Sequence, residues 1–171
     1  MTIRIFGVSL LPASARRPHA IAGVCRRVLK SERAGRREEI SIVFLDRRRM
    51  RALNKRFLGR DRDTDVIAFS YPEDAGPARG EKPFGDVFIS AGLARAQAKE
   101  VGHSVLSEVL FLTAHGTLHL LGYDDKTARG RARMFRLQQK AIKSSKMKPL
   151  GHKVSRACHR TKCPANIRPN P

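Results

Sequence analysis

Two histidines and an aspartate in the segment HGTLHLLGYDD, residues 115–125, have the types and spacing of a metal site. His115 and His119 are four residues apart, so on a helix their rings share one face and can hold the same ion. Gly122 can end that helix and turn the chain back, which would bring Asp125 to the same point. Two imidazoles and one carboxylate form an open three-ligand site, and an ion there lowers the pKa of bound water toward about 7. The segment therefore predicts metal-dependent hydrolytic chemistry.

The alternative interpretation of the two histidines is structural, because a histidine in an apolar helix is usually a neutral core residue with a hydrogen-bond partner. Two of them at this spacing, in a helix that is apolar on nearly every side, each need such a partner, and a bound metal provides one for both. For the third ligand we prefer Asp125, and the neighbouring Asp124 is the residue that could replace it.

The same residues also match the extended metallopeptidase pattern H-E-x-x-H-x-x-G-x-x-H. His115 and His119 stand at its first and fifth positions, and Gly122 and Asp125 at its eighth and eleventh. The second position, where the peptidase needs its Glu general base, is Gly116. Without that carboxylate the peptidase mechanism has no proton acceptor. A metallopeptidase is therefore disfavoured, and another metal-dependent hydrolase is favoured.

Strand-like and helix-like segments alternate around this motif. Segments rich in Ile, Val and Phe at residues 2–8, 39–45, 65–70 and 85–90 predict strands. Helical patterns cover residues 19–32, 46–57, 90–101, 104–121 and 126–143, with N-cap candidates at Asp46, Ser90 and Ser104. The first two strands, joined by a helix, favour parallel pairing, and the last two, joined by a Pro/Gly-rich loop, favour antiparallel pairing. We expect an α+β fold, a small mixed β-sheet of about four strands packed with about five helices, with the metal site at the end of the apolar helix.

The charge of the chain points to a polyanionic partner. It has 35 Lys and Arg against 15 Asp and Glu, a net charge of +20, which favours RNA or DNA over an anionic membrane. Aromatic residues make up only 6%, which disfavours a large base-stacking platform. Candidate phosphate contacts lie in two basic helices: Arg47, Arg48, Arg49, Lys55, Arg56 and Arg60 in or after the first, and Arg129, Arg131, Arg133 and Arg136 in the second. No apolar run has the length of a membrane span, and three cysteines make a poor disulfide framework, which favours a reducing compartment.

The composition changes after residue 144. Residues 145–171 contain no Asp or Glu and few large apolar residues, so we expect a single domain over residues 1–144 and a basic, disordered tail over 145–171. Cys158, His159 and Cys163 lie in this tail at a spacing that matches no zinc module, and a solvated tail is the favoured interpretation.

Three blocks of sequence resemble the YbeY family of zinc-dependent, single-strand-specific endoribonucleases. The motif HGTLHLLGYDD is similar to the family signature H-G-x-L-H-L-x-G-Y-D-H. LNKRFLGRDRDTDVIAF, residues 53–69, is similar to LN…D…T-D-V-L-S-F, and FGDVFIS, residues 84–90, is similar to L-G-D-I-x-I-S. The blocks follow the family order over residues 53–125, and the β-α-β start suits the family fold. The tail lies outside the resemblance.

The resemblance implies cleavage of single-stranded RNA in small-subunit rRNA maturation and ribosome quality control. It implies the ribosome or ribosomal proteins as partners, no membrane, and a location in the bacterial cytoplasm or, in a eukaryote, an organelle. It also implies that His115, His119 and position 125 bind one Zn²⁺ ion. Asp125 replaces the usual third His; a carboxylate binds zinc at a similar distance, about 2.0–2.2 Å, and also suits Mn²⁺ or another harder ion. Leu58 stands where many members carry an Arg thought to serve cleavage, with Arg56 and Arg60 nearby.

The main rival is a non-catalytic RNA- or ribosome-binding protein with a structural metal, which explains the charge without any chemistry. Structural zinc sites usually have four protein ligands, so an open three-ligand site favours catalysis. Attack by water and attack by the ribose 2′-OH both fit such a site. Asp65 and Asp86 are candidate general bases, although each could equally have an ordinary structural role.

Overall fold

A four-stranded mixed sheet organises the part of the chain that the computed structural model describes, residues 2–32, 38–71 and 82–143. The strands are β1 (Thr2–Phe6), β2 (Glu38–Leu45), β3 (Val66–Ser70) and β4 (Lys82–Ser90), in the spatial order β1-β2-β4-β3. β1 and β4 both run parallel to β2, and β3 runs antiparallel to β4, so both predicted pairings are confirmed. The first strand is shorter than predicted: Gly7 adopts a φ of 71°, which ends β1 and opens a 3-10 turn.

The described residues form five α-helices with boundaries close to those predicted. They are α1 (Pro18–Ser31), α2 (Arg47–Leu58), α3 (Ala91–Val101), α4 (Val105–Leu120) and α5 (Ala128–Lys143). Local capping explains where α2, α3 and α4 begin, because the side chains of Asp46, Ser90 and Ser104 each accept a hydrogen bond from a backbone N–H in the first turn. Gly59 and Gly102 end α2 and α3 with φ values of 65° and 78°. The predicted α+β fold is thus confirmed.

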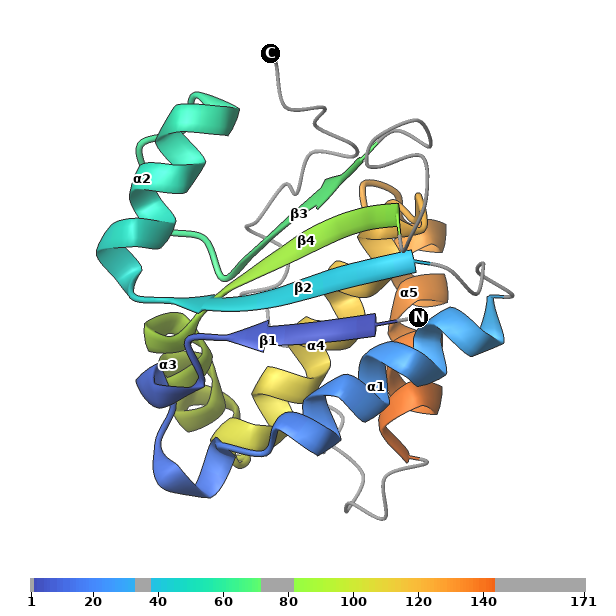
Figure 1. The fold of residues 1–171 in the computed structure, drawn as a ribbon, viewed down its shortest axis with the longest axis horizontal. Helices are drawn as coiled ribbons and strands as arrows, with labels where there is room; N and C mark the ends of the chain where they lie inside the picture. Colours follow the sequence, from blue (N-terminus) through green and yellow to red (C-terminus); the bar gives the residue numbers. More distant parts are fainter. Residues whose placement is uncertain (1, 33–37, 72–81, 144–171) are drawn as a thin grey trace.

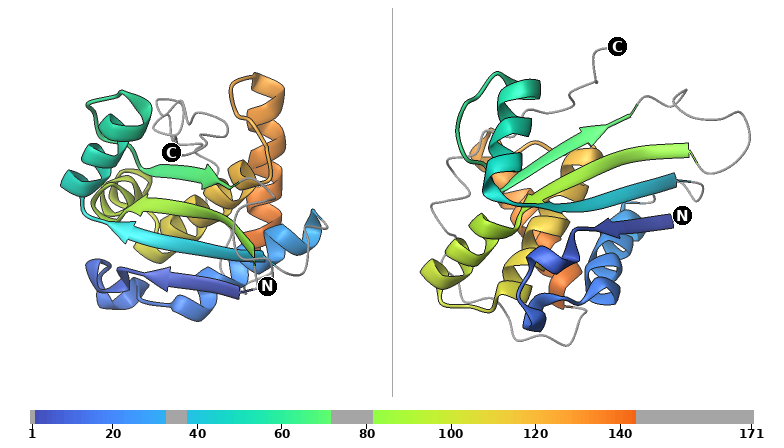
Figure 2. Two further views of the ribbon diagram at one scale, coloured as in Figure 1. Left: turned by 45° about the horizontal axis from the view of Figure 1, so that its top comes forward. Right: turned by 60° about the vertical axis from the view of Figure 1, so that its left-hand side comes forward.

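Helices α1, α3, α4 and α5 lie on one face of the sheet, and α2 lies toward the other (Figures 1 and 2). α4 packs on β3 and β4 and is itself contacted by α1, α3 and α5. This central position explains its composition, since a helix that is apolar all round must be buried all round. The alternate residues of the parallel strands that point to α4, such as Ile40, Ile42 and Val87, are fully buried.

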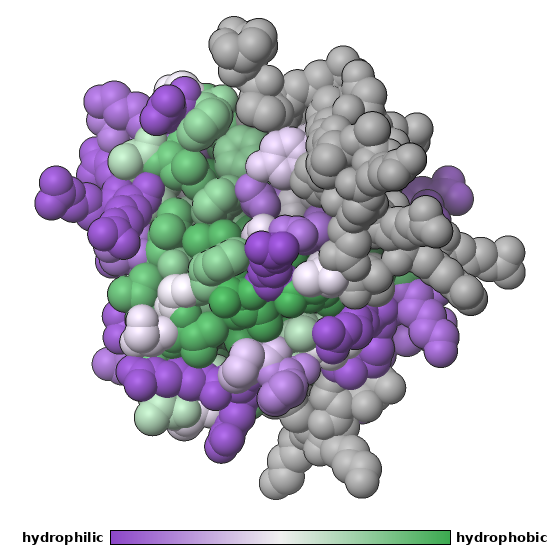
Figure 3. All heavy atoms as spheres, viewed as in Figure 1, coloured by the Kyte–Doolittle hydropathy of each residue, from purple (hydrophilic) through white to green (hydrophobic). Residues whose placement is uncertain are grey.

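The second face of the sheet has a smaller apolar cluster under α2. Met50, Ile67 and Phe69 are buried there, and Leu53, Leu58 and Phe88 pack partly buried against them. Figure 3 shows apolar side chains across the centre of this face, with charged residues around them. α2 is therefore anchored by its apolar stripe, and its basic residues point outward.

The predicted tail, residues 145–171, lies outside the described residues. Among the helices that the structure describes, none is both long enough and apolar enough to cross a bilayer.

Candidate metal centre

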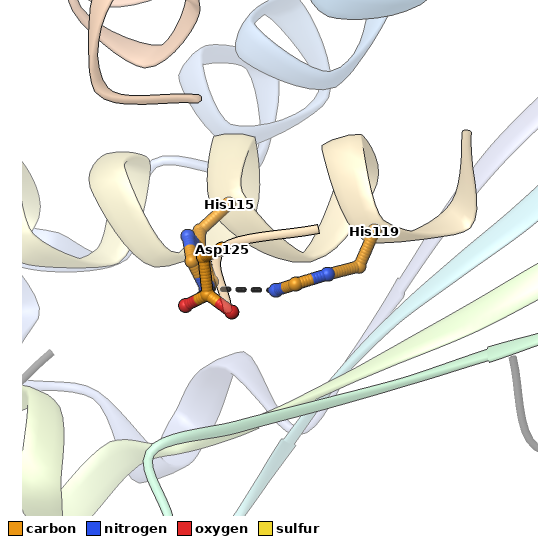
Figure 4. A group of neighbouring side chains, drawn as sticks. All are labelled: His115, His119 and Asp125. Atoms are coloured by element: carbon orange, nitrogen blue, oxygen red, sulfur yellow. Dashed lines mark hydrogen bonds and ion pairs between the residues drawn. The ribbon is translucent and has the colours of Figure 1, made fainter. Parts of the chain in front are cut away.

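Helix α4 places two imidazoles side by side near its C-terminal end. His115 and His119 are one turn apart, and their rings extend from the same side of the helix (Figure 4). The two Nε2 atoms lie 3.0 Å apart, and the ring planes meet at 86°. Both side chains are buried, with 4% and 5% exposure. The sequence spacing predicted this shared face, and the structure shows it.

A tight turn after α4 brings a carboxylate to the same point. Gly122 has a φ of 82°, and the N–H of Tyr123 donates to the Leu118 carbonyl at 3.1 Å, which folds the chain back along the helix end. Asp125 Oδ2 then lies 3.9 Å from His115 Nε2. One donor atom from each of the two histidines and Asp125 lies within 4.8 Å of the other two, so this group could hold a metal ion.

The two neighbouring aspartates point in different directions. Asp124 accepts a hydrogen bond from the Lys126 backbone N–H at 2.8 Å and forms an ion pair with Lys126 Nζ at 3.1 Å. Asp125 is held inward, because Arg131 Nη1 donates to the backbone carbonyls of Asp125 at 3.1 Å and of Lys126 at 3.0 Å. The structure therefore favours Asp125 over Asp124 as a third ligand.

Tyr123 orients His119 through its backbone. The Tyr123 carbonyl lies 2.9 Å from His119 Nδ1. Because a carbonyl can only accept, Nδ1 carries the proton and the lone pair of the neutral ring is on Nε2, facing His115. The Tyr123 hydroxyl donates to Glu32 at the end of α1, and the Arg133 guanidinium lies 4.7 Å above its ring. No local sequence signal points to Glu32, which lies 91 residues from Tyr123 along the chain.

The electrostatics of the site suit a cation. Burial, and then the proximity of His119, lower the pKa of His115 to about 3. Burial also lowers the pKa of His119, while the Asp125 carboxylate opposes that shift. Both rings are thus neutral at neutral pH, and His115 Nδ1 has no hydrogen-bond partner among the described residues. Two nitrogens on one tetrahedral zinc ion would lie about 3.3 Å apart, close to the separation observed, so the donor set fits the ion.

Gly116 explains why α4 can lie so close to the sheet. A Cβ atom at this position would lie 2.3 Å from Val87 Cγ1 and 3.2 Å from Val66 Cγ2. The position where a metallopeptidase has its catalytic Glu therefore faces the packed core. This contact supports the exclusion of a standard zinc peptidase, which the sequence already disfavoured.

The two candidate general bases take part in hydrogen bonds of the fold. Asp65 is 2% exposed and accepts from the Val66 N–H at 2.9 Å and from Gln97 Nε2 at 2.8 Å, which ties the start of β3 to α3. Asp86 accepts from the Tyr71 hydroxyl at 2.6 Å, and burial together with this bond raises the pKa of Tyr71 to about 12. Neither belongs to the His115, His119 and Asp125 group.

The predicted RNA contacts lie on two helices, α2 and α5, which stand well apart in Figure 1. On α2, Lys55 forms an ion pair with Asp61 at 3.0 Å, and the Arg56 guanidinium lies 5.4 Å from the Phe57 ring. Arg60 follows the end of α2, and Leu58 packs against the apolar cluster beneath that helix. On α5, Arg129 and Arg133 are exposed, and Arg133 lies against Tyr123 beside the metal centre.

Comparisons with known proteins agree with this arrangement. The family model described as "Endoribonuclease YbeY" matches residues 13–146. The endoribonuclease YbeY of Pelotomaculum thermopropionicum is 38% identical over 141 residues, which cover 79% of this chain and 93% of that protein. The endoribonuclease YbeY of Elusimicrobium minutum is 36% identical over 137 residues, which cover 78% and 92%. A solution structure of a Thermotoga maritima protein matches with a TM-score of 0.55 at 22% identity, over 89% of this chain and all of that one, and shows the same fold.

Proposed function

Because the chain belongs to the YbeY endoribonuclease family, we propose that it cleaves RNA at the centre formed by His115, His119 and Asp125. The observation that carries the proposal is the convergence of three metal-ligating side chains within 4.8 Å in a chain of this family. We propose Zn²⁺ as the ion, since two imidazoles and a carboxylate suit it, while the carboxylate also suits Mn²⁺. When bound, such an ion supplies charge stabilisation at a phosphate oxygen and makes a coordinated water more acidic.

The residues of the chain prepare this centre before an ion or RNA arrives. His115 and His119 are neutral at neutral pH, so an ion does not have to displace the second proton of an imidazolium from either ring. The Tyr123 carbonyl keeps the Nε2 lone pair of His119 directed into the centre. Asp125 adds the negative charge that two neutral rings lack, and Arg131 holds its backbone. Three protein ligands leave a coordination position for substrate, as catalytic zinc sites require.

We further propose single-stranded RNA, and within it small-subunit rRNA, as the substrate, with the ribosome or ribosomal proteins as partners in the cytoplasm or an organelle. Two features support this assignment: the family motifs in residues 53–125, and a net charge of +20, which favours a polyanionic partner. The proposed functional unit is the domain over residues 1–144, with residues 145–171 as a basic tail.

Cleavage of an end-labelled, unstructured RNA tests the activity. We compare the full-length protein with His119→Ala, and with His19→Ala as a control, since His19 is an exposed histidine of α1 outside the centre. Wild type and the control should cut, chelation should stop both, and His119→Ala should be inactive. If all three cut equally, the activity belongs to a contaminant or another site. If none cuts, a non-catalytic RNA-binding protein becomes the better interpretation.

A pair of isosteric variants tests the ligand set. Asp125→Asn and Asp124→Asn each remove one carboxylate charge at adjacent positions, but only Asp125 faces the histidines. Calorimetric titration with Zn²⁺ should show at least a tenfold loss of affinity for Asp125→Asn and near wild-type affinity for Asp124→Asn. Equal affinities for the two variants would remove Asp125 from the proposed site.

A further inference from the structure

We propose that one face of α5 is a track for the phosphate backbone of single-stranded RNA that leads away from the metal centre. The track, here called the α5 stripe, consists of Arg129, Arg133, Arg136, Lys140 and Lys143. The inference rests on the proposed function, because it assigns the surface that holds the RNA whose bond is cleaved at the centre.

The stripe is continuous and exposed. Its members recur at alternating steps of four and three residues, so they follow one side of the helix, about one cation per turn over about 21 Å. All five are exposed, while the residues on the other side of α5, including Met134, Gln138 and Ile142, are buried against the rest of the protein. The geometry therefore presents a straight row of positive charge to solvent.

No carboxylate of the described residues pairs with this charge. The sequence contains no Asp or Glu from residue 126 to its end. Among the described residues, Arg129, Arg136, Lys140 and Lys143 have neither a hydrogen bond nor an ion pair through their side chains. Like charges one turn apart repel each other, and Arg129 lies in the first turn, where the helix dipole disfavours a cation. A bound polyanion would remove both penalties.

Helix α2 carries six Lys and Arg residues, as many as α5, but several of them are paired with carboxylates. Its Arg47 is paired with Asp63, and its Arg51 and Lys55 are both paired with Asp61 in the loop that follows. A phosphate that approached these cations would have to displace a carboxylate. By contrast, no carboxylate among the described residues pairs with the α5 stripe, so a phosphate needs no such exchange there.

The stripe also begins beside the metal centre. Arg133 contacts the Tyr123 hydroxyl at 3.2 Å, and the Tyr123 carbonyl orients His119. Arg131, on the same first turns of α5, holds the Asp125 backbone. RNA bound along the stripe would therefore have one end near the reacting bond. These contacts reach phosphates and not bases, so they give affinity without sequence preference.

The packing of α5 favours RNA over a membrane surface. A basic helix that binds a bilayer inserts an apolar face, but the apolar side of α5 is occupied by α4 and α1. A membrane partner would have to dislodge the helix from the core. A nucleic acid needs only the row of cations that is already exposed.

The test compares two triple variants of the full chain that lose the same charge. Arg136→Gln/Lys140→Gln/Lys143→Gln removes the part of the stripe farthest from the metal centre. The control, Arg26→Gln/Arg95→Gln/Lys99→Gln, removes three exposed cations from α1 and α3. Circular dichroism and thermal unfolding verify that both variants are folded. A third variant, Arg136→Lys/Lys140→Arg/Lys143→Arg, keeps the charge and should restore binding.

Binding is measured by fluorescence anisotropy with an unstructured, labelled RNA in the presence of EDTA, over a series of salt concentrations. The stripe variant should lose about tenfold or more in affinity, and its salt slope should fall by about 2, because each single-strand phosphate contact contributes about 0.7. The control should lose less than threefold. Equal losses in the two variants, or no loss in the stripe variant, would overturn the proposal. Binding to vesicles of phosphatidylcholine and phosphatidylserine is measured in parallel. If the stripe variant loses affinity for the vesicles but not for RNA, the proposal is also overturned.

The outcome is separable from that of the proposed function. Binding in EDTA requires no catalysis, so His119→Ala should bind RNA as wild type does. If wild type binds RNA through the stripe but does not cut, the stripe stands and the nuclease proposal fails. If wild type cuts while the stripe variant keeps its affinity and KM, the stripe fails and the nuclease stands. With both correct, the stripe variant has a raised KM and a nearly unchanged kcat.

Discussion

Replacing Gly116 by Ala should destabilise the protein, although Ala is the better helix former. In the middle of a helix the exchange normally gains about 1 kcal/mol. At this position, however, the new Cβ would lie 2.3 Å from Val87 Cγ1. Carbon atoms in good contact are about 3.5–4.0 Å apart, so the overlap exceeds about 1 Å. Val87 is fully buried on a central strand and cannot move aside.

The magnitude follows from these opposing effects. Overpacking costs about 1–3 kcal/mol, and an overlap of this size against a rigid strand belongs at the upper end. After the gain in helix propensity, we expect a net loss of about 2 kcal/mol in the free energy of unfolding. Urea unfolding followed by circular dichroism measures it. Gly23→Ala is the matched control, since its Cβ would meet only the Arg27 guanidinium, at 3.3 Å, and this variant should equal or exceed wild-type stability.

A double-mutant cycle isolates the contact. Val87→Ala removes the methyl groups nearest to the new Cβ, so Gly116→Ala should cost less in the Val87→Ala background than in wild type. The overlap with Val87 should also push α4 away from the sheet. This shift should weaken zinc binding, because Gly116 lies next to His115. The reasoning is refuted if Gly116→Ala is as stable as wild type, or if the two substitutions are simply additive.

Three further predictions concern other parts of the molecule. The hydrogen bond that His103 Nε2 donates to the Glu108 carboxylate raises the pKa of His103. Its stabilisation of the folded state is fully present below about pH 6.5 and is lost as the pH rises through the folded pKa. Urea unfolding at low and high pH should therefore show wild type losing its advantage over His103→Gln. Burial raises the pKa of Cys25 to about 11, so in a variant with serines at the two tail cysteines, a thiol reagent should label the protein only after denaturation. Asp125→His, which restores the usual family residue, should keep zinc affinity and lower the affinity for Mn²⁺, and titration with both ions measures the ratio.

Local signals predicted most of the elements and their ends. Caps such as Asp46, Ser90 and Ser104 act within one turn of the residue that carries them, so they can be read from the chain alone. The four-residue spacing of the two histidines is of the same kind, because the helical period alone sets their shared face. The chain directions in the β1–β2 and β3–β4 pairs were also predictable, because each depends on the type of connection between the two strands.

Other features depended on contacts between distant segments. The sequence preferred Asp125 over Asp124 only through its position in the motif, and the turn geometry and the Arg131 contact show which one faces inward. Lys55 stays a predicted RNA contact, and only the fold shows that Asp61 lies beside it. The role of Glu32 likewise became visible only when α1 was placed against Tyr123.

The sequence by itself determined which residues can do chemistry and on which helices they lie, since these properties follow from residue type and from the period of one helix. The tertiary structure decided which of those residues meet and which charges remain available. Metal affinity depends on three donor atoms that converge at one point, and RNA attraction depends on cations that no carboxylate has neutralised. Both are properties of distances between segments that the chain brings together only when it folds.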